Sequence, residues 1–202
     1  LPPTLDGNII GIATSSNSGT TNAIMKNNVI RDLFGNESIH AIDNRIDGIK
    51  LYHNTINIKN PLNLAVDIVG LYYVNTNGIE LKNNLIAIDG NTNASYYAIQ
   101  EYFFNSTLSS NYNNFHLSPS SSTAQNFAKI NNTTYATIRD WRSLTARDQN
   151  SLTLDPQFVS SENLTPLNIG LKGAGTNLNV TKDFYDKLRK TSPDMGAIAI
   201  DT

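Results

Sequence analysis

Residues 48–58 read GIKLYHNTINI and residues 78–88 read GIELKNNLIAI, so the two segments align without a gap at an offset of 30 residues. A shorter copy, AIMKNNVI, occupies residues 23–30, and a degraded copy, SNYNNFHL, occupies residues 110–117. Self-similarity at a nearly constant period is typical of solenoid proteins, in which each repeat packs on the next. The sequence therefore predicts a stack of structural repeats.

Each copy contains two short strands separated by asparagine. Ile49 and Leu51 alternate with polar residues, and the alternation resumes after Asn54 with Ile56 and Ile58. A period of two is the pattern of a strand with one buried face. Asparagine also tolerates the left-handed backbone conformation that a tight corner needs. We expect the corner asparagines to stack as a structural ladder, about 4.8 Å apart. The expected ladder residues are Asn28, Asn54, Asn84 and Asn114.

A third strand is expected in each repeat, at residues 41–43, 65–68 and 98–100, where alanine precedes an apolar and a polar residue. Three short strands in a repeat of about 30 residues predict an all-β fold. We expect a right-handed, single-stranded parallel β-helix with a short lateral helix and a C-terminal cap. Neither a leucine-rich frame nor a helical period of 3.6 is present. A β-sandwich whose similar strands recur by chance remains the alternative.

The chain divides into three expected parts of one continuous domain. Residues 1–117 form the coils, and residues 118–150 form a loop and a short helix that Thr134 caps and that runs to about Ser143. Residues 151–202 form the final coils and the C-terminal cap. On the helix, Ile138 and Trp141 share a face, so Trp141 is expected to be structural, with a sugar-stacking platform as the alternative. The N-terminal end of the coils predicts upstream coils, another domain or a partner protein.

Bulk composition excludes several classes of function. The formal charge is −2 and only 16% of the residues are charged, so no basic footprint for nucleic acid is present. The chain has no cysteine, which excludes disulfides and cysteine-based metal or nucleophile chemistry. No apolar run approaches 18 residues, so no membrane span is expected.

These residues resemble the parallel β-helix repeats of the pectin-lyase-like superfamily. The downstream half resembles a C-terminal region that follows such repeats in secreted bacterial proteins. The matching segments are residues 111–114, Trp141 with residues 148–151, residues 155–159 and residues 193–197. Residues 171–175 and 186–189 depart from the family pattern. The resemblance implies a protein that is secreted or on the bacterial cell surface. It implies no single activity, because enzymes and adhesins share this ending.

Two aspartates are the first candidates for chemistry. The third-strand alignment places Asp43 and Asp67 outward on adjacent coils, with Gln100 on the next coil as a candidate ligand-binding residue. Carboxylates about 5 Å apart suit a shared Ca²⁺, as in lyases, or a retaining glycosidase pair. Exposure of both side chains to solvent is the alternative without chemistry.

The remaining candidates lie in the repeat itself. Lys50 and Glu80 stack on neighbouring coils as an ion pair or as catalytic groups, and Tyr52 and Lys82 are surface residues or ligand-binding groups. The three histidines, His40, His53 and His116, fall at unlike positions in the coil, so no metal site is expected.

Two functions from different classes follow. The first is a non-catalytic secreted or cell-surface module that is glycan-binding, adhesive or structural and has no cofactor. The second is a polysaccharide lyase or glycoside hydrolase acting on a polysaccharide, an acidic one included, with Ca²⁺ if it is a lyase. The polar exterior, rich in Asn, Ser and Thr, favours the first.

Overall fold

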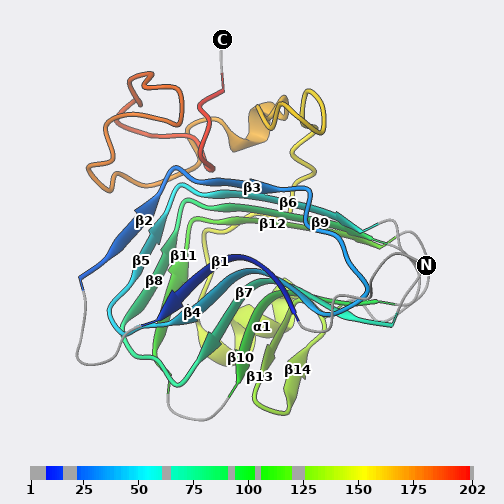
Figure 1. Cartoon of the computed structure of the whole chain (residues 1–202). Helices are drawn as coiled ribbons and strands as arrows, with labels where there is room; N and C mark the ends of the chain where they lie inside the picture. The colour runs from blue at the N-terminus through cyan, green and yellow to red at the C-terminus, as the bar shows by residue number, and fades with distance from the viewer. Residues whose placement is uncertain are drawn as a thin grey trace.

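The computed structural model describes residues 8–15, 22–60, 65–90, 94–102, 106–119 and 126–200. Its strands form three sheets that surround one core, as Figure 1 shows. Sheet A contains, in spatial order, β1 (Ile9–Ser15), β4 (Ile39–Arg45), β7 (Asp67–Val74), β10 (Ser95–Tyr102), β13 (Ala128–Ile130) and β14 (Thr133–Tyr135). Sheet B contains β2 (Ile24–Lys26), β5 (Lys50–Tyr52), β8 (Ile79–Lys82) and β11 (Leu108–Asn111). Sheet C contains β3 (Val29–Arg31), β6 (Thr55–Asn60), β9 (Leu85–Gly90) and β12 (Asn114–Pro119).

Each turn of the chain contributes one strand to sheet B, then one to sheet C and one to sheet A. The next turn begins with the neighbouring strand of sheet B. Strands from successive turns pair in parallel, and only β13 and β14, among the described strands, pair antiparallel. The result is a parallel β-solenoid of about three turns with one short α-helix. The prediction of an all-β parallel β-helix is therefore confirmed.

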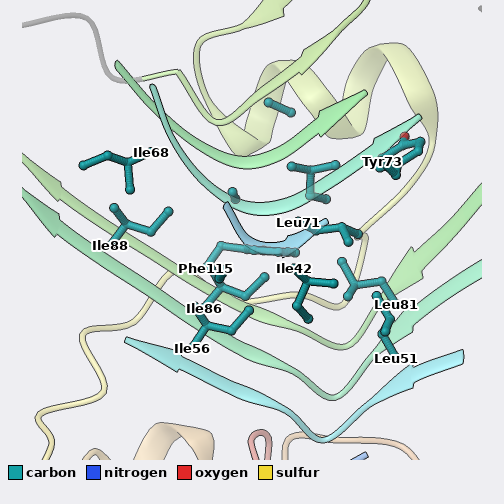
Figure 2. Packing of buried hydrophobic residues seen from close by; sticks show 14 of the residues in the cluster. Ile42, Leu51, Ile56, Ile68, Leu71, Tyr73, Leu81, Ile86, Ile88 and Phe115 are labelled. Atoms are coloured by element: carbon teal, nitrogen blue, oxygen red, sulfur yellow. The ribbon is translucent and has the colours of Figure 1, made fainter. Parts of the chain in front are cut away.

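Equivalent apolar side chains stack inside the tube. Ile56, Ile86 and Phe115 come from successive strands of sheet C, and Leu51 and Leu81 come from sheet B. Figure 2 shows them converging on the side chains of sheet A. All five are at most 1% exposed, so the period-two alternation identified the inward face of sheets B and C correctly.

A residue with left-handed backbone turns each corner between sheets B and C. The φ angles are 55° at Asn27, 52° at His53, 57° at Asn83 and 58° at Tyr112. Each of these residues immediately precedes an asparagine whose backbone N–H donates a hydrogen bond to a side chain in the following turn. Two neighbouring residues therefore share the two tasks that we had assigned to one asparagine: the first reverses the chain, and the second connects the turns.

The ladder of asparagines is present and runs in one direction. The Asn28 N–H donates to Oδ1 of Asn54 at 3.1 Å, and the Asn54 N–H donates to Oδ1 of Asn84 at 2.9 Å. The side-chain Nδ2 groups of Asn28 and Asn54 donate to the same two oxygens. Asn54 and Asn84 are buried, so these bonds satisfy polar groups that have little access to water.

The fourth ladder residue is Asn113, which corrects our placement of Asn114. The Asn84 N–H and Nδ2 donate to Oδ1 of Asn113 at 2.9 and 3.1 Å. Asn114 instead begins β12 opposite Leu85, and its side chain exchanges hydrogen bonds with the backbone of Leu154. The spacing shortens from 30 to 29 residues at this step. Two consecutive asparagines made the position ambiguous in the sequence.

The register of sheet A corrects the predicted pairing of Asp43 with Asp67. Asp43 lies opposite Tyr72, and Tyr72 lies opposite Gln100, whereas Asp67 lies opposite Ser95. Because Tyr72 follows Asp67 by five residues, Asp67 lies about 16 Å along the strand direction from the row that contains Asp43. Residues on both faces of β4 and β7 are buried, so polar alternation does not reveal which residues of these strands face each other.

A helix covers the C-terminal end of the tube. Helix α1 (Ile138–Thr145) begins after Thr137, whose side chain and Asp140 form a capping box. The expected cap, Thr134, lies in β14 instead, because this segment pairs with β13. Trp141 is fully buried in the same core cluster as Phe127. The helix therefore covers the core at the last turn of the solenoid.

The segment after residue 151 adds no full coil to the described part of the tube. It contains one 3-10 helix, η1 (Ile169–Leu171), and short bridges, and Figure 1 shows it across the outside of sheet C. Leu171 and Met195 pack on Leu85 and Ala87, which point outward from β9. Residues 151–200 therefore cover one side of the solenoid, where we had expected final coils and an end cap. No helix among the described residues is long and apolar enough to cross a membrane.

Candidate functional site

Four of the sequence-predicted candidates lie together on the outer face of sheet B. Lys50 is opposite Glu80, and Tyr52 is opposite Lys82. The intervening Leu51 points into the core, so these four side chains point outward. Tyr52 is nevertheless only 7% exposed, which corrects its prediction as a surface residue. Lys26 of β2 extends the second row, because it lies opposite Tyr52. We call the group of Lys26, Lys50, Tyr52, Glu80 and Lys82 the basic face.

Glu80 is the hydrogen-bonded centre of the basic face. Its Oε2 accepts from the Tyr52 hydroxyl at 2.8 Å and from Nζ of Lys82 at 2.9 Å. The bond from Lys82 lowers the pKa of Glu80 more than partial burial raises it, and Tyr52 lowers it further. Burial, followed by the bond to Glu80, raises the pKa of Tyr52. Lys50 stacks opposite Glu80 as predicted, yet the ion pair that Glu80 forms is with Lys82 on its own strand.

Two adjoining hollows border this face. The first has a volume of about 430 Å³ and lies over Glu80, Lys82 and Ser109. The second, of about 680 Å³, is also lined by Lys82 and Ser109, and extends to Arg147 and Asn177. Because they share lining residues, the two hollows form one open groove that starts on sheet B and passes the end of α1. Each hollow alone has a volume in the range of sites that bind small organic ligands.

Sequence reasoning missed Arg147 and Asn177 as groove residues. Arg147 follows α1, and its guanidinium carbon lies 5.3 Å from the centre of the Trp141 ring. Asn177 comes from the segment that covers sheet C. Both reach the groove from outside the repeat, so periodicity in the sequence carried no signal for them.

The predicted site at Asp43 is a separate cluster on sheet A. Asp43 is 2% exposed and accepts two hydrogen bonds from the Arg45 guanidinium, both at 3.0 Å. The His40 ring stacks on Tyr72 with centroids 4.1 Å apart, and burial lowers the pKa of His40 although Asp43 partly opposes this. Asp43 is thus neutralised by Arg45 and occupies a packed environment. Gln100 lies one strand beyond Tyr72 in the same row.

The shared Ca²⁺ that the lyase alternative would place at Asp43 and Asp67 has no matching set of ligands there. Asp67 is too far along the strand from Asp43 to share a cation with it, and Arg45 already binds both oxygens of Asp43. Across the six described ranges, no three His, Asp or Glu side chains come close enough together to hold a metal ion. Ca²⁺ ligation normally needs six or more oxygens, most of them from carboxylates or carbonyls. The donors at Asp43 do not fit that requirement.

A second cleft lies between the outside of sheet C and residues 155–161. It has a volume of about 330 Å³ and a mixed polar lining that includes Lys59, Asp89, His116 and Asp155. Nε2 of His116 lies 4.0 Å from Oδ1 of Asp155. This cleft contains two carboxylates, Asp89 and Asp155, and one lysine, Lys59, in contrast to the basic face.

No protein-family model, curated protein or solved structure matches this chain. The parallel solenoid is therefore established by its own sheet pairing. The resemblance to the pectin-lyase-like superfamily stays an expectation from the sequence.

Proposed function

We propose that the protein is a non-catalytic glycan-binding module, secreted or on the bacterial cell surface, whose basic face holds an acidic polysaccharide. One observation carries the proposal. The basic face and its groove present Lys26, Lys50, Lys82 and Arg147 around a single carboxylate, Glu80, although the whole chain has a net charge of −2. The positive charge is therefore a local feature of this surface.

The repeat spacing suits a polymer with regularly placed acidic groups. Lys26 and Lys82 flank Tyr52 in one row, so their backbones are about 9.6 Å apart at two strand spacings. Each exposed contact between an ammonium and an anion contributes little alone, typically below about 1 kcal/mol. Several contacts to one chain add through effective concentration, which favours a polymer over a single sugar.

The same geometry argues for binding without cleavage. A glycosidase needs two carboxyl groups about 5 to 9.5 Å apart across the scissile bond. The predicted pair, Asp43 and Asp67, is separated by register, and Glu80 is the one carboxylate of the basic face. The alternative function, a polysaccharide lyase or glycoside hydrolase, thereby loses the aspartate pair as its support and keeps only the family resemblance.

The test compares polygalacturonate with neutral dextran by affinity electrophoresis and calorimetry. We expect binding of polygalacturonate that weakens steeply as salt rises from 50 to 500 mM, and none of dextran. The double variant Lys50→Gln/Lys82→Gln should weaken binding about tenfold or more, which corresponds to about 1.4 kcal/mol. Lys190→Gln is the matched control, because Lys190 is an exposed lysine outside the groove and should leave affinity unchanged.

Two results would count against the proposal. If wild-type protein fails to bind polygalacturonate and other carboxylated or sulfated glycans at low salt, the basic face is not a glycan site. If incubation releases unsaturated products or new reducing ends, the protein is catalytic and the alternative function takes its place. Both variants must retain the wild-type melting temperature for the affinities to be compared.

A further inference from the structure

The cleft on the outside of sheet C has a floor made of two rows of side chains from successive strands. The first row consists of Asn57, Ala87 and His116, and the next row of Lys59, Asp89 and Ser118. In the first row, the methyl group of Ala87 lies between two much longer polar side chains. A small residue between larger ones leaves a hollow, so the repeat itself creates the floor of the cleft.

Residues 155–161 form the opposite wall, in the segment that Figure 1 shows across the outside of sheet C. The N–H groups of Leu167 and Asn168 donate to the carbonyl of Pro156 at 3.1 and 3.2 Å. Nδ2 of Asn168 also donates to the carbonyl of Asp155 at 2.7 Å. These bonds hold the wall without a ligand, so the cleft of about 330 Å³ is preformed, as most small-molecule sites are.

Asn57 carries an amide that the folded chain does not use. Its side chain is only 5% exposed, and no other described residue forms a hydrogen bond with it. A nearly buried amide normally has a partner, because removing it from water without one is unfavourable. Nε2 of His116 lies 4.0 Å from Oδ1 of Asp155, which is longer than a hydrogen bond, so these two groups do not satisfy each other. The cleft therefore presents polar groups that a ligand can satisfy.

The charges of the lining favour an uncharged ligand. Asp89 and Asp155 would repel the acidic groups that suit the basic face, and the one lysine, Lys59, lies directly opposite Asp89. Within the described ranges, no three His, Asp or Glu side chains come close enough together to hold a metal ion. A ligand with several hydroxyl groups meets the remaining requirement. Each hydroxyl both donates and accepts, as an amide and two carboxylates need.

We propose that this cleft binds a single neutral sugar ring. The amide of Asn57 and the carboxylates of Asp89 and Asp155 bind its hydroxyl groups, and the C–H face of the ring lies on Ala87 and Phe158, the apolar part of the lining. The volume is at the lower end of the range for small-molecule sites, about 300 to 1,000 Å³, which suits one ring. The site is on sheet C, so it is separate from the basic face on sheet B and goes beyond the proposed function.

The experiment titrates the full chain with the methyl glycosides of glucose, galactose, mannose and rhamnose, followed by calorimetry and by amide chemical shifts. We expect saturable binding of at least one glycoside with a Kd on the order of 1 mM. The amide signals of Asn57, Ala87 and His116 should shift. Because the ligand is uncharged, its affinity should change by less than about twofold between about 50 and about 500 mM salt.

Four variants locate the binding. Asn57→Ala should weaken it about tenfold or more and leave the melting temperature unchanged, because the amide has no partner to lose among the described residues. Asp89→Ala, a change at an exposed side chain, should weaken it as well. Asn132→Ala is the matched control, since Asn132 is an exposed asparagine outside the cleft. Lys50→Gln/Lys82→Gln should bind the glycosides as the wild type does, which separates this test from that of the basic face.

Three results would overturn the inference. If none of the four glycosides binds saturably at up to about 50 mM, some fifty times the expected Kd, the cleft is not a sugar site. If Asn57→Ala and Asp89→Ala both keep the wild-type affinity, any binding takes place elsewhere. If Lys50→Gln/Lys82→Gln abolishes the binding, the sugar occupies the basic face.

Discussion

Asn84 is hydrogen-bonded to both neighbouring turns and is 1% exposed. Its Nδ2 donates to the carbonyl of Leu51 and to Oδ1 of Asn113, and its Oδ1 accepts from the N–H and Nδ2 of Asn54. A single amide therefore satisfies buried polar groups on two other layers. Aspartate could only accept in this position and alanine could do neither, which gives a physical reason for the recurrence of asparagine.

The change Asn84→Ala should lower the free energy of unfolding by about 2 to 4 kcal/mol, because it leaves buried backbone and side-chain groups without partners. Urea denaturation measures this loss. Asn22→Ala is the control, since Asn22 is exposed and lies outside the strands, and it should change stability by less than about 0.5 kcal/mol. Similar losses in the two variants would contradict a structural role for the ladder.

His53 gives the protein a predictable sensitivity to acid. It is fully buried at a corner, and burial, with a further contribution from the charge of Arg189, lowers the pKa of His53 to about 3 from an ordinary 6.5. The folded protein thus holds the neutral ring, whereas the unfolded chain takes up a proton as the pH falls below 6.5. Stability from this group is present above pH 6.5 and declines from there toward pH 3.

Between pH 7 and pH 5 the loss from His53 should be on the order of 2 kcal/mol. His53→Asn is the informative variant, because Asn27 and Asn83 adopt the same left-handed conformation at the equivalent corners. We expect the variant to lose less stability than the wild type between these two pH values, as measured by urea denaturation at each. His40 contributes equally to both proteins, so an identical loss in the two would exclude His53 as the cause.

Among the elements, strand β8 of sheet B and strand β4 of sheet A differ in how their residues are exposed. In β8 the burial alternates strictly, with Ile79 and Leu81 inside and Glu80 and Lys82 outside. In β4 the six residues from Ile39 to Asn44 are all buried. In a strand such as β8, the alternation of apolar and polar residues determines which side chains face the core. In a strand such as β4, which is buried on both faces, the register depends on packing against the neighbouring strands.

Helix α1 is short, and its stability depends on one anchoring residue. Trp141 packs against Phe127 and Tyr135, with ring centroids 5.8 and 5.1 Å away, and its Nε1 donates to Oδ2 of Asp148 at 2.8 Å. An isolated helix of eight residues has little stability in water, so the tertiary contacts of Trp141 hold it in place.

Trp141→Ala should therefore cost about 3 to 5 kcal/mol of unfolding free energy, the range for removal of a large buried aromatic residue. Leu144→Ala provides the control on the same helix, because Leu144 is 73% exposed and alanine favours helix. Thermal denaturation of both variants is the measurement. If Leu144→Ala lost as much stability as Trp141→Ala, the packing of Trp141 on the core would not be what determines the stability of the protein at this end.

At the scale of the whole molecule, one core runs through all the turns, but its layers are not equally protected. Met25, Leu51 and Leu81 occupy equivalent inward positions on successive strands of sheet B. Leu81 is 1% exposed in the interior of the stack, whereas Met25, in the first described strand of sheet B, is half-buried. Each layer of a solenoid is stabilised by the layers on either side, and the end layer has one neighbour fewer.

Leu81→Ala should accordingly destabilise the protein by about 2 to 5 kcal/mol, and Met25→Ala by about 1 kcal/mol or less. Urea denaturation of the two variants makes the comparison directly, and each serves as the control for the other. Equal losses would mean that the first described layer of sheet B is as well packed as the interior.

Periodicity in the sequence by itself determined the class of fold and much of the candidate site. The 30-residue offset between Ile49 and Ile79 also places Lys50 beside Glu80 and Tyr52 beside Lys82, because parallel strands in register bring equivalent residues together. The same reasoning found Asn54 and Asn84 as ladder neighbours. These conclusions need only local alternation and a constant repeat.

Tertiary structure decided the rest. The register of Asp43 against Tyr72 depends on packing against both faces of sheet A, and the choice of Asn113 over Asn114 depends on a turn one residue shorter. Arg147 reaches the groove only because α1 closes the end of the tube, and residues 152–200 cover sheet C through contacts with β9. Contacts between segments without a repeat leave no periodic trace in the sequence, so only the folded chain reveals them.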